Sequence, residues 1–179
     1  RARGGDAAAW APPHANVHQA VVEEALAGPC VAGKVGVVGF GPAAVVEKSV
    51  VRGVKSDDAG GCECGLNPGL AKVAVIERRK RTGKRGIGIL EGYGLTGGAI
   101  ATTISHDSHN IVVAGDNDPD MLLAVRELAD MGGGIVSVHG GSIRRLPLPI
   151  AGLMTSADPQ AVNAVLHAMP VAARSDPGI

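Results

Sequence analysis

The chain has 179 residues, 45% of them hydrophobic, with 27 glycines, three cysteines and a formal net charge of zero. This length and apolar content fit one domain with a core, whereas zero net charge gives no field toward nucleic acid or an anionic membrane, so neither partner is expected. Three cysteines make no disulfide framework and no apolar run is long enough to span a membrane, so we expect a cytoplasmic location.

The N-terminal part of the chain gives weak structural signals. Residues 1–33 are predicted to be a poorly ordered lead-in with one short helix over 16–26, where Asn16 can cap it. Residues 35–39 are apolar and predict a buried strand, whereas the pattern of 43–51 fits either a helix or a strand. Residues 55–69 are rich in Gly and Asp and predict a loop. The main domain is therefore expected over residues 34–179.

Clearer elements follow from Leu70 onward. Strands are predicted over 70–77 and 86–90, 99–104 and 111–114, and 135–138 and 142–146. Helices are predicted to begin at Asp118-Pro119 and at Asp158-Pro159, because these pairs supply an N-cap and a first-turn proline. The predicted class is α+β, with a mixed, partly antiparallel sheet and helices packed on one side.

A polar cluster interrupts the two central strands, and it is the best candidate site. Ser105-His106-Asp107-Ser108-His109-Asn110 contains two imidazoles and one carboxylate, which can exchange protons near neutral pH. A solvated turn between two strands is the simpler alternative. The His-x-x-His spacing fits two metal ligands, but without further ligands the metal interpretation is weak.

Other segments have simpler interpretations. Glu77 and Arg78 precede a basic turn and are expected to be solvated, because exposed charge pairs contribute little. Residues 146–154, LPLPIAGLM, are expected to form an extended apolar arm that packs across another surface. Gly39-x-Gly41-x-x-Ala44, with Asp57 and Asp58 beyond it, resembles a dinucleotide-binding fingerprint in outline. The repeated strand–helix units that this motif requires do not follow, so an oxidoreductase is a distant alternative.

A run of motifs gives a more specific indication. The segments that carry it are 75–78, 81–83, 86–88, 92–95, 98–101, 106–110, 120–121, 133–134 and 146–154. In this order and spacing they resemble the C-terminal domain of bacterial adenine deaminases, members of the amidohydrolase superfamily. The likeness is strong over residues 70–154, plausible back to about Lys34, and stops short of the family's usual end. Arg79 departs from the family, which commonly carries His there.

The resemblance implies a hydrolase that converts adenine and water to hypoxanthine and ammonia. It also implies a divalent metal, manganese or iron, which activates water in a TIM barrel of about 250 residues. This sequence has no such barrel, so we expect the metal site elsewhere in the parent enzyme, no strong metal binding by this chain, and inactivity of this portion alone. The expected partners are adenine, the enzyme's own barrel domain and further copies in a homo-oligomer.

Two roles remain open for the polar loop. His106, Asp107, His109 and Asn110 are the candidate residues for contact with the substrate, or for ordering a loop that closes over it. Alternatively, the loop only stabilises a junction between domains, with its polar groups satisfied among themselves. A non-catalytic accessory or oligomerisation domain is the corresponding alternative function.

Overall fold

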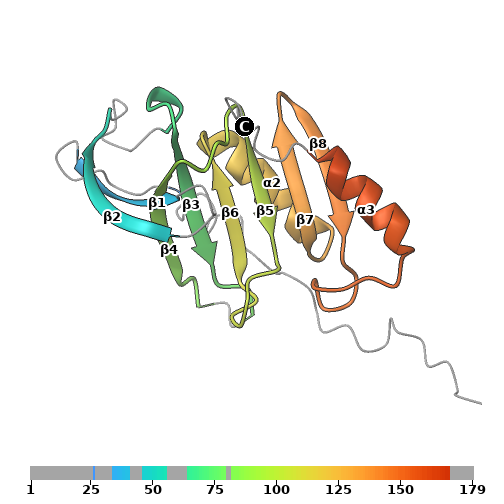
Figure 1. Ribbon diagram of the computed structural model, residues 1–179. Helices are drawn as coiled ribbons and strands as arrows, with labels where there is room; N and C mark the ends of the chain where they lie inside the picture. Colours follow the sequence, from blue (N-terminus) through green and yellow to red (C-terminus); the bar gives the residue numbers. More distant parts are fainter. Residues whose placement is uncertain (1–25, 27–33, 41–45, 56–63, 80–81, 170–179) are drawn as a thin grey trace, which may run out of the picture.

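A computed structural model describes residue 26 and residues 34–40, 46–55, 64–79 and 82–169. Its strands form one open eight-stranded sheet in the order β2-β1-β4-β3-β6-β5-β7-β8 (Figure 1). The elements are β1 (Lys34–Phe40), β2 (Val46–Gly53), the 3₁₀ turn η2 (Cys64–Leu66), β3 (Leu70–Ile76), β4 (Arg85–Glu91), β5 (Gly98–Thr102), β6 (Ile111–Gly115), α2 (Asp118–Asp130), β7 (Gly134–His139), β8 (Ser142–Pro147) and α3 (Pro159–Ala168). The α+β class is confirmed, and the described strands close no barrel.

The sheet is mixed, as predicted. Neighbouring strands pair antiparallel except β1 and β4, which run parallel. Both predicted hairpins form, β3 with β4 and β7 with β8. The second is closed by Gly140 and Gly141 at φ of 53° and 78°, the left-handed conformation that a tight two-residue hairpin turn requires.

The part of the ambiguous segment 43–51 that the structure describes, residues 46–51, is a strand. β2 begins at Val46 and pairs antiparallel with β1. A dinucleotide fingerprint needs a helix after the first strand, so this pairing contradicts the oxidoreductase alternative. Residues 41–45, Asp57 and Asp58 lie outside the described part of the chain.

Helix α2 covers one face of the sheet and forms the main core with it. Asn117, rather than the expected Asp118, is the N-cap, because its side chain accepts a hydrogen bond from the backbone N–H of Asp120. Met121, Val125 and Leu128 are fully buried against β3, β5, β6 and β7. Burial of such side chains contributes about 1.5–3 kcal/mol each, so this layer stabilises the central strands.

Helix α3 lies on the opposite face, which corrects the expectation that both helices pack on one side. Its Val162 and Val165 contact Leu146 and the adjoining Ile135. Ile135 and Leu146 are register partners. The next pair along the two strands, Val136 and Arg145, has its side chains on the α2 face, so Ile135 and Leu146 point to the opposite face. Because successive strand residues point to opposite faces, β8 separates the two helices, α2 behind the sheet and α3 beside β8 in Figure 1.

Of the predicted lead-in, residues 1–25 and 27–33 lie outside the described part. Leu26 is helical and only 2% exposed within the core. Its carbonyl oxygen accepts a hydrogen bond from Nζ of the buried Lys72, which also lies 2.6 Å from Asp118 Oδ1. None of the described helices is both long and apolar enough to cross a membrane.

Candidate functional site

Four segments that are far apart in the sequence meet at one end of the sheet, the lower end in Figure 1. Arg78 follows β3, residues 105–110 join β5 to β6, Gly133 precedes β7, and residues 150–154 follow β8. We call this group the loop cluster. Each segment belongs to one of the motifs singled out in the sequence, so the fold brings those motifs together.

The 105–110 loop is shaped by hydrogen bonds within itself. The N–H of His109 donates to the carbonyl of Ser105 at 2.8 Å, and the Ser105 and Ser108 hydroxyls are 2.9 Å apart. Asp107 and His109 adopt positive φ values of 65° and 50°, which non-glycine residues rarely do. The loop therefore holds a defined turn with two backbone positions under strain.

The candidate side chains of this loop differ in exposure. His106 Nδ1 is 3.2 Å from Asp107 Oδ1, and these side chains are 95% and 89% exposed. His109 and Asn110 are partly buried, and Nδ1 of His109 is buried without a hydrogen-bond partner among the described residues. The loop thus presents an imidazole and a carboxylate outward, while His109 turns its Nδ1 into the protein.

Thr103 connects the base of this loop to two other members of the cluster. Its fully buried hydroxyl accepts from the N–H of Gly134 at 2.8 Å and donates to the carbonyl of Gly152. Gly133 sits against Thr103 and Gly152, because a Cβ there would lie 2.7 Å from Gly152 Cα and 3.0 Å from Thr103 Oγ1. This close contact requires glycine at 133.

Arg78 is the member of the cluster that sequence reasoning missed. It was expected to be solvated, but its exposed fraction is 8%, and Nη2 donates to the carbonyl of Ala151 at 2.8 Å. Burial, and then the charge of Arg79, lower the pKa of Arg78 below its ordinary value. Nη1 is buried without a partner among the described residues.

The expected apolar arm supplies the partners of Arg78. Leu146 and Leu148 are buried beneath α3, so the arm packs on its own chain, although Met154 remains 57% exposed. A Cβ at Gly152 would lie 2.5 Å from Arg78 Nη2. The sequence shows an Arg at the end of a predicted strand and an Ala-Gly step in the proline-containing segment. No local pattern indicates that these two sites, 73 positions apart, are in contact.

Glu77 organises the turn between β3 and β4. Its carboxylate accepts hydrogen bonds from the backbone N–H groups of Arg79, at 2.5 Å, and Thr82, at 3.1 Å. Such bonds fix a turn that carries several basic residues. Glu77 therefore has a structural role next to the loop cluster.

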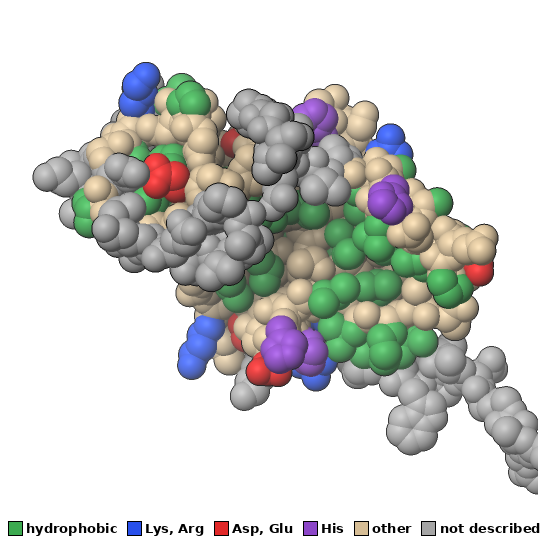
Figure 2. Space-filling view, viewed as in Figure 1, with side chains coloured by type: hydrophobic (Ala, Val, Ile, Leu, Met, Phe, Trp, Pro, Cys, Tyr) green, Lys and Arg blue, Asp and Glu red, His purple; other side chains and the backbone are tan. Residues whose placement is uncertain are grey.

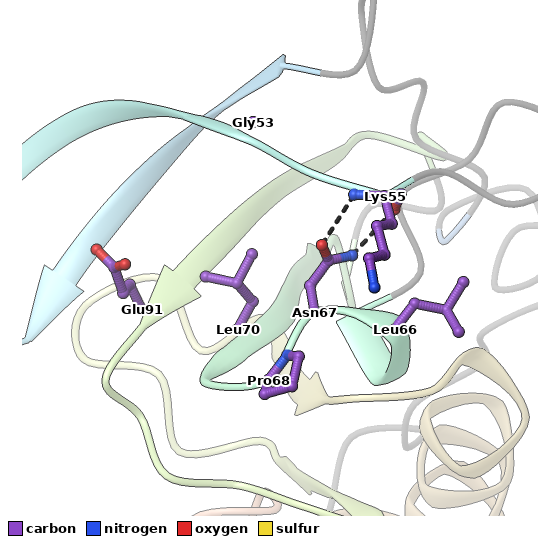
Figure 3. Close-up of a pocket in the computed structure, with 7 residues that line it drawn as sticks. All are labelled: Gly53, Lys55, Leu66, Asn67, Pro68, Leu70 and Glu91. Carbon is purple, nitrogen blue, oxygen red and sulfur yellow. Dashed lines mark hydrogen bonds between the residues drawn. The ribbon is translucent and has the colours of Figure 1, made fainter.

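A shallow pocket lies at the other end of the sheet (Figure 3). It has a volume of about 260 Å³ and is lined by Gly53, Lys55, Leu66, Asn67, Pro68, Leu70 and Glu91. The Asn67 side chain closes one wall by accepting from the N–H of Lys55 and donating to its carbonyl, at 2.8 and 2.9 Å. The loop cluster contributes no lining residue, so the pocket and the candidate residues are separate.

The described residues offer no metal centre. No group of three or more His, Cys, Asp or Glu side chains gathers among them in positions that could hold an ion. His106, Asp107 and His109 belong to one loop, but their side chains are not arranged to hold one metal ion together. The chemistry that this loop itself offers is hydrogen bonding and proton exchange through exposed groups.

Comparison with known protein families gives one match that covers most of the sequence. Residues 44–179 match the family model described as the adenine deaminase C-terminal domain. The matched range includes every strand from β2 to β8, both described helices and the whole loop cluster.

Curated relatives agree with this match. A protein named adenine deaminase from Nitratidesulfovibrio vulgaris strain Hildenborough is 53% identical over 136 residues, which are 74% of this chain and 23% of the relative. Adenine deaminases from Clostridium acetobutylicum and Bacillus subtilis strain 168 are 56% and 47% identical over 95 residues, 52% of this chain and 17% and 16% of theirs. The chain thus spans less than a quarter of the length of these relatives.

Proposed function

Because this chain belongs to the adenine deaminase C-terminal domain family, we propose that it forms the C-terminal domain of an adenine-hydrolysing enzyme. The observation that carries the proposal is the match over residues 44–179, supported by relatives named for that activity. The convergence of the motif segments in the loop cluster adds to it, because a shared functional surface explains why they meet.

The proposed parent reaction is hydrolytic deamination. A water oxygen bonds to the purine carbon that carries the amino group, the carbon–nitrogen bond breaks, and ammonia leaves with hypoxanthine as the other product. The relatives' names support adenine as the substrate class. The proposal includes a role for the parent enzyme in purine catabolism and adenine salvage.

A divalent metal, manganese or iron, is part of the proposal for the parent enzyme, where it would activate water. The described residues do not fit this metal, because no suitable group of three ligands occurs among them. We propose that the metal ligands lie in the part of the enzyme outside this chain, and we assign no step through the metal to the described residues.

The proposed contribution of this chain is the exposed edge of the 105–110 loop. The His106 imidazole and the Asp107 carboxylate are outward-facing and lie on a backbone fixed by Ser105 and Ser108. Such groups can donate to and accept from the ring nitrogens and exocyclic amine of a purine at a domain boundary. His109 and Asn110, being partly buried, would position the loop.

A non-catalytic accessory domain is the second candidate. It is favoured by the hydrogen bonds within the cluster, because Thr103 and the two loop serines find partners inside the domain. In that case the loop serves as a rigid contact between domains. A homo-oligomer in the cytoplasm is compatible with both candidates and forms part of the proposal.

Ammonia release from adenine in the presence of Mn²⁺ tests the proposal. The chain is assayed alone and mixed with the Nitratidesulfovibrio vulgaris relative from which the matched segment has been removed. We expect activity only in the mixture. Activity of the chain alone would contradict the placement of the metal ligands, and an inactive but assembled mixture would favour the accessory role.

A further inference from the structure

On the face opposite α2, described residues cover the central strands only in part: Ala71, Leu90 and Ala114 are buried there, with Val73, Tyr93 and Ile100 packed against them. On β3, β5 and β6, the side chains of Val73, Val75, Ile100, Thr102 and Val112 point away from α2, as their register pairs show. We call Val75, Thr102 and Val112, which lie outside that packed group, the open sheet face. Figure 2 shows hydrophobic side chains gathered on this side of the sheet. Val75 is 36% exposed, and the other two are partly buried.

The composition of these strands predicts burial on both faces. Ala74 and Val113 face α2 and are fully buried, while Val75 and Val112, one residue along each strand, are also apolar. A sheet with one solvated face normally alternates apolar with polar residues. Here the alternation is missing, which indicates that the open sheet face is covered in the assembled protein.

Helix α3 covers only the β8 side of this face. Its Val162 and Val165 contact Leu146 and Ile135, and Met169 packs in the same group. The open sheet face lies beyond this contact, on β5, β6 and β3, which are on the opposite side of β7 from β8 in the sheet order. Neither described helix packs on Val75, Thr102 or Val112.

Building on the proposed function, we propose that the open sheet face docks the part of the deaminase polypeptide that this chain does not contain. The relatives offer enough chain for this, because the 136 matched residues are only 23% of the Nitratidesulfovibrio vulgaris protein. Contacts between domains of one chain commonly bury about 600–1,500 Å². The remainder of the relative is large enough to supply such a surface.

Charge argues against a second copy as the occupant. On the face opposite α2, the described strands β3 to β8 carry no acidic side chain. Among these strands, Arg144 is the one Lys or Arg residue on that face. A two-fold interface would present the same patch to itself, so the opposing face would offer Arg144 no counter-charge. The docked surface is expected to be apolar, with an acidic group at its edge facing Arg144.

The test uses two positions of similar exposure on opposite faces. Val75 is 36% exposed on the open sheet face, while Ile87 is 39% exposed and pairs with Ala74, whose side chain faces α2. Val75→Cys and Ile87→Cys are compared in this chain alone and in the Nitratidesulfovibrio vulgaris relative whose matched segment is replaced by residues 44–179. Maleimide modification at each introduced thiol is followed by site-resolved mass spectrometry.

We expect both thiols to react at similar rates in the chain alone, and the thiol at position 75 to react at least tenfold more slowly in the fused protein. Equal rates at both positions in the fused protein, or protection at position 87 only, would overturn the proposal. So would protection at position 75 that grows with the concentration of the isolated chain, because it would identify a second copy as the occupant.

A binding measurement covers the case in which the fused protein does not fold, which its thermal melting would reveal. Sedimentation of the chain with the truncated relative should show a complex that Val75→Glu weakens at least tenfold and Ile87→Glu leaves unchanged. A complex indifferent to Val75→Glu, or no complex at all, would contradict docking at this face. Ammonia release is scored separately, so docking without activity would refute the proposed function and leave this inference standing.

Discussion

Nη2 of Arg78 donates a hydrogen bond to the carbonyl oxygen of Ala151 at 2.8 Å, across 73 positions of the sequence. This contact ties the end of β3 to the segment after β8 and completes the loop cluster. It also places a buried cation directly against Gly152. The stability of this end of the sheet should therefore depend on residues that look unremarkable in the sequence.

Gly152→Ala should destabilise the protein more than Gly140→Ala, although both glycines have positive φ. At Gly140 a Cβ meets open space, so only the backbone penalty of about 1–2 kcal/mol applies. At Gly152 the Cβ overlaps the Arg78 guanidinium, which should add about 1–3 kcal/mol. Urea unfolding of the two variants measures the difference, and equal free energies of unfolding would show that Arg78 moves aside without cost.

Thr103→Val should cost more than Thr103→Ser. Valine keeps the shape but leaves the Gly134 N–H and the Gly152 carbonyl unpartnered, at about 1–3 kcal/mol for each buried group. Serine retains both hydrogen bonds and loses one methyl group, which costs about 0.8 kcal/mol. Free energies of unfolding decide between them. A valine variant as stable as the serine variant would mean that the hydroxyl's hydrogen bonds contribute little.

Acid should weaken the contact between α2 and β8. The hydrogen bond from Arg145 Nε, 2.6 Å from Glu127 Oε2, lowers the pKa of Glu127 below its ordinary value of 4.5. A lowered pKa in the folded state means that the stabilisation is present above the unfolded value and disappears as the pH falls through the folded value. Glu127→Gln should therefore be less stable than the wild type at pH 7 but not at pH 2.

Urea midpoints at the two pH values measure this change. Asp130→Asn, at an exposed carboxylate on the same helix, controls for the loss of a negative charge. The prediction is wrong if the stability difference between wild type and Glu127→Gln is the same at both pH values, or if the control shows the same pH dependence.

His106→Ala should lower kcat/KM for adenine in the reconstituted enzyme at least about tenfold, or ~1.4 kcal/mol of transition-state stabilisation. The reason is that its imidazole is 95% exposed and available to a substrate at the domain boundary. His167→Ala, at an exposed histidine on α3, should leave the rate unchanged. If His106→Ala assembles normally and has wild-type kinetics, the loop makes no substrate contact that matters and the accessory role is favoured.

Most of the elements predicted correctly were indicated by local sequence signals, namely helix-capping and turn residues. Asp118-Pro119 marked the start of α2 to within one residue, and His139-Gly140-Gly141 located the β7–β8 hairpin. These signals act within a few residues, through capping and turn geometry. The 105–110 loop was found in the same way, as a polar run between two apolar strands.

Long-range features could not be predicted in this way. The apolar stripe of α3 does not reveal which face of the sheet it covers, because that depends on the register that pairs Ile135 with Leu146. Arg78 looked solvated because its partner is Ala151, whose position depends on the path of the chain after β8. The parallel pairing of β1 with β4 likewise carries no local signal.

The β1–β2 hairpin joins the other strands through a short seam. β1 meets β4 in only three register pairs, from Val37–Ile89 to Gly39–Glu91, whereas β3 and β4 pair over seven. An element with so few pairings can open as a unit while the rest of the protein stays folded. When it opens, the backbone N–H and C=O groups along the edge of β4 become free to accept a strand from another chain. The local free energy of that opening, rather than global stability, then sets how often this edge is exposed to strand exchange or aggregation.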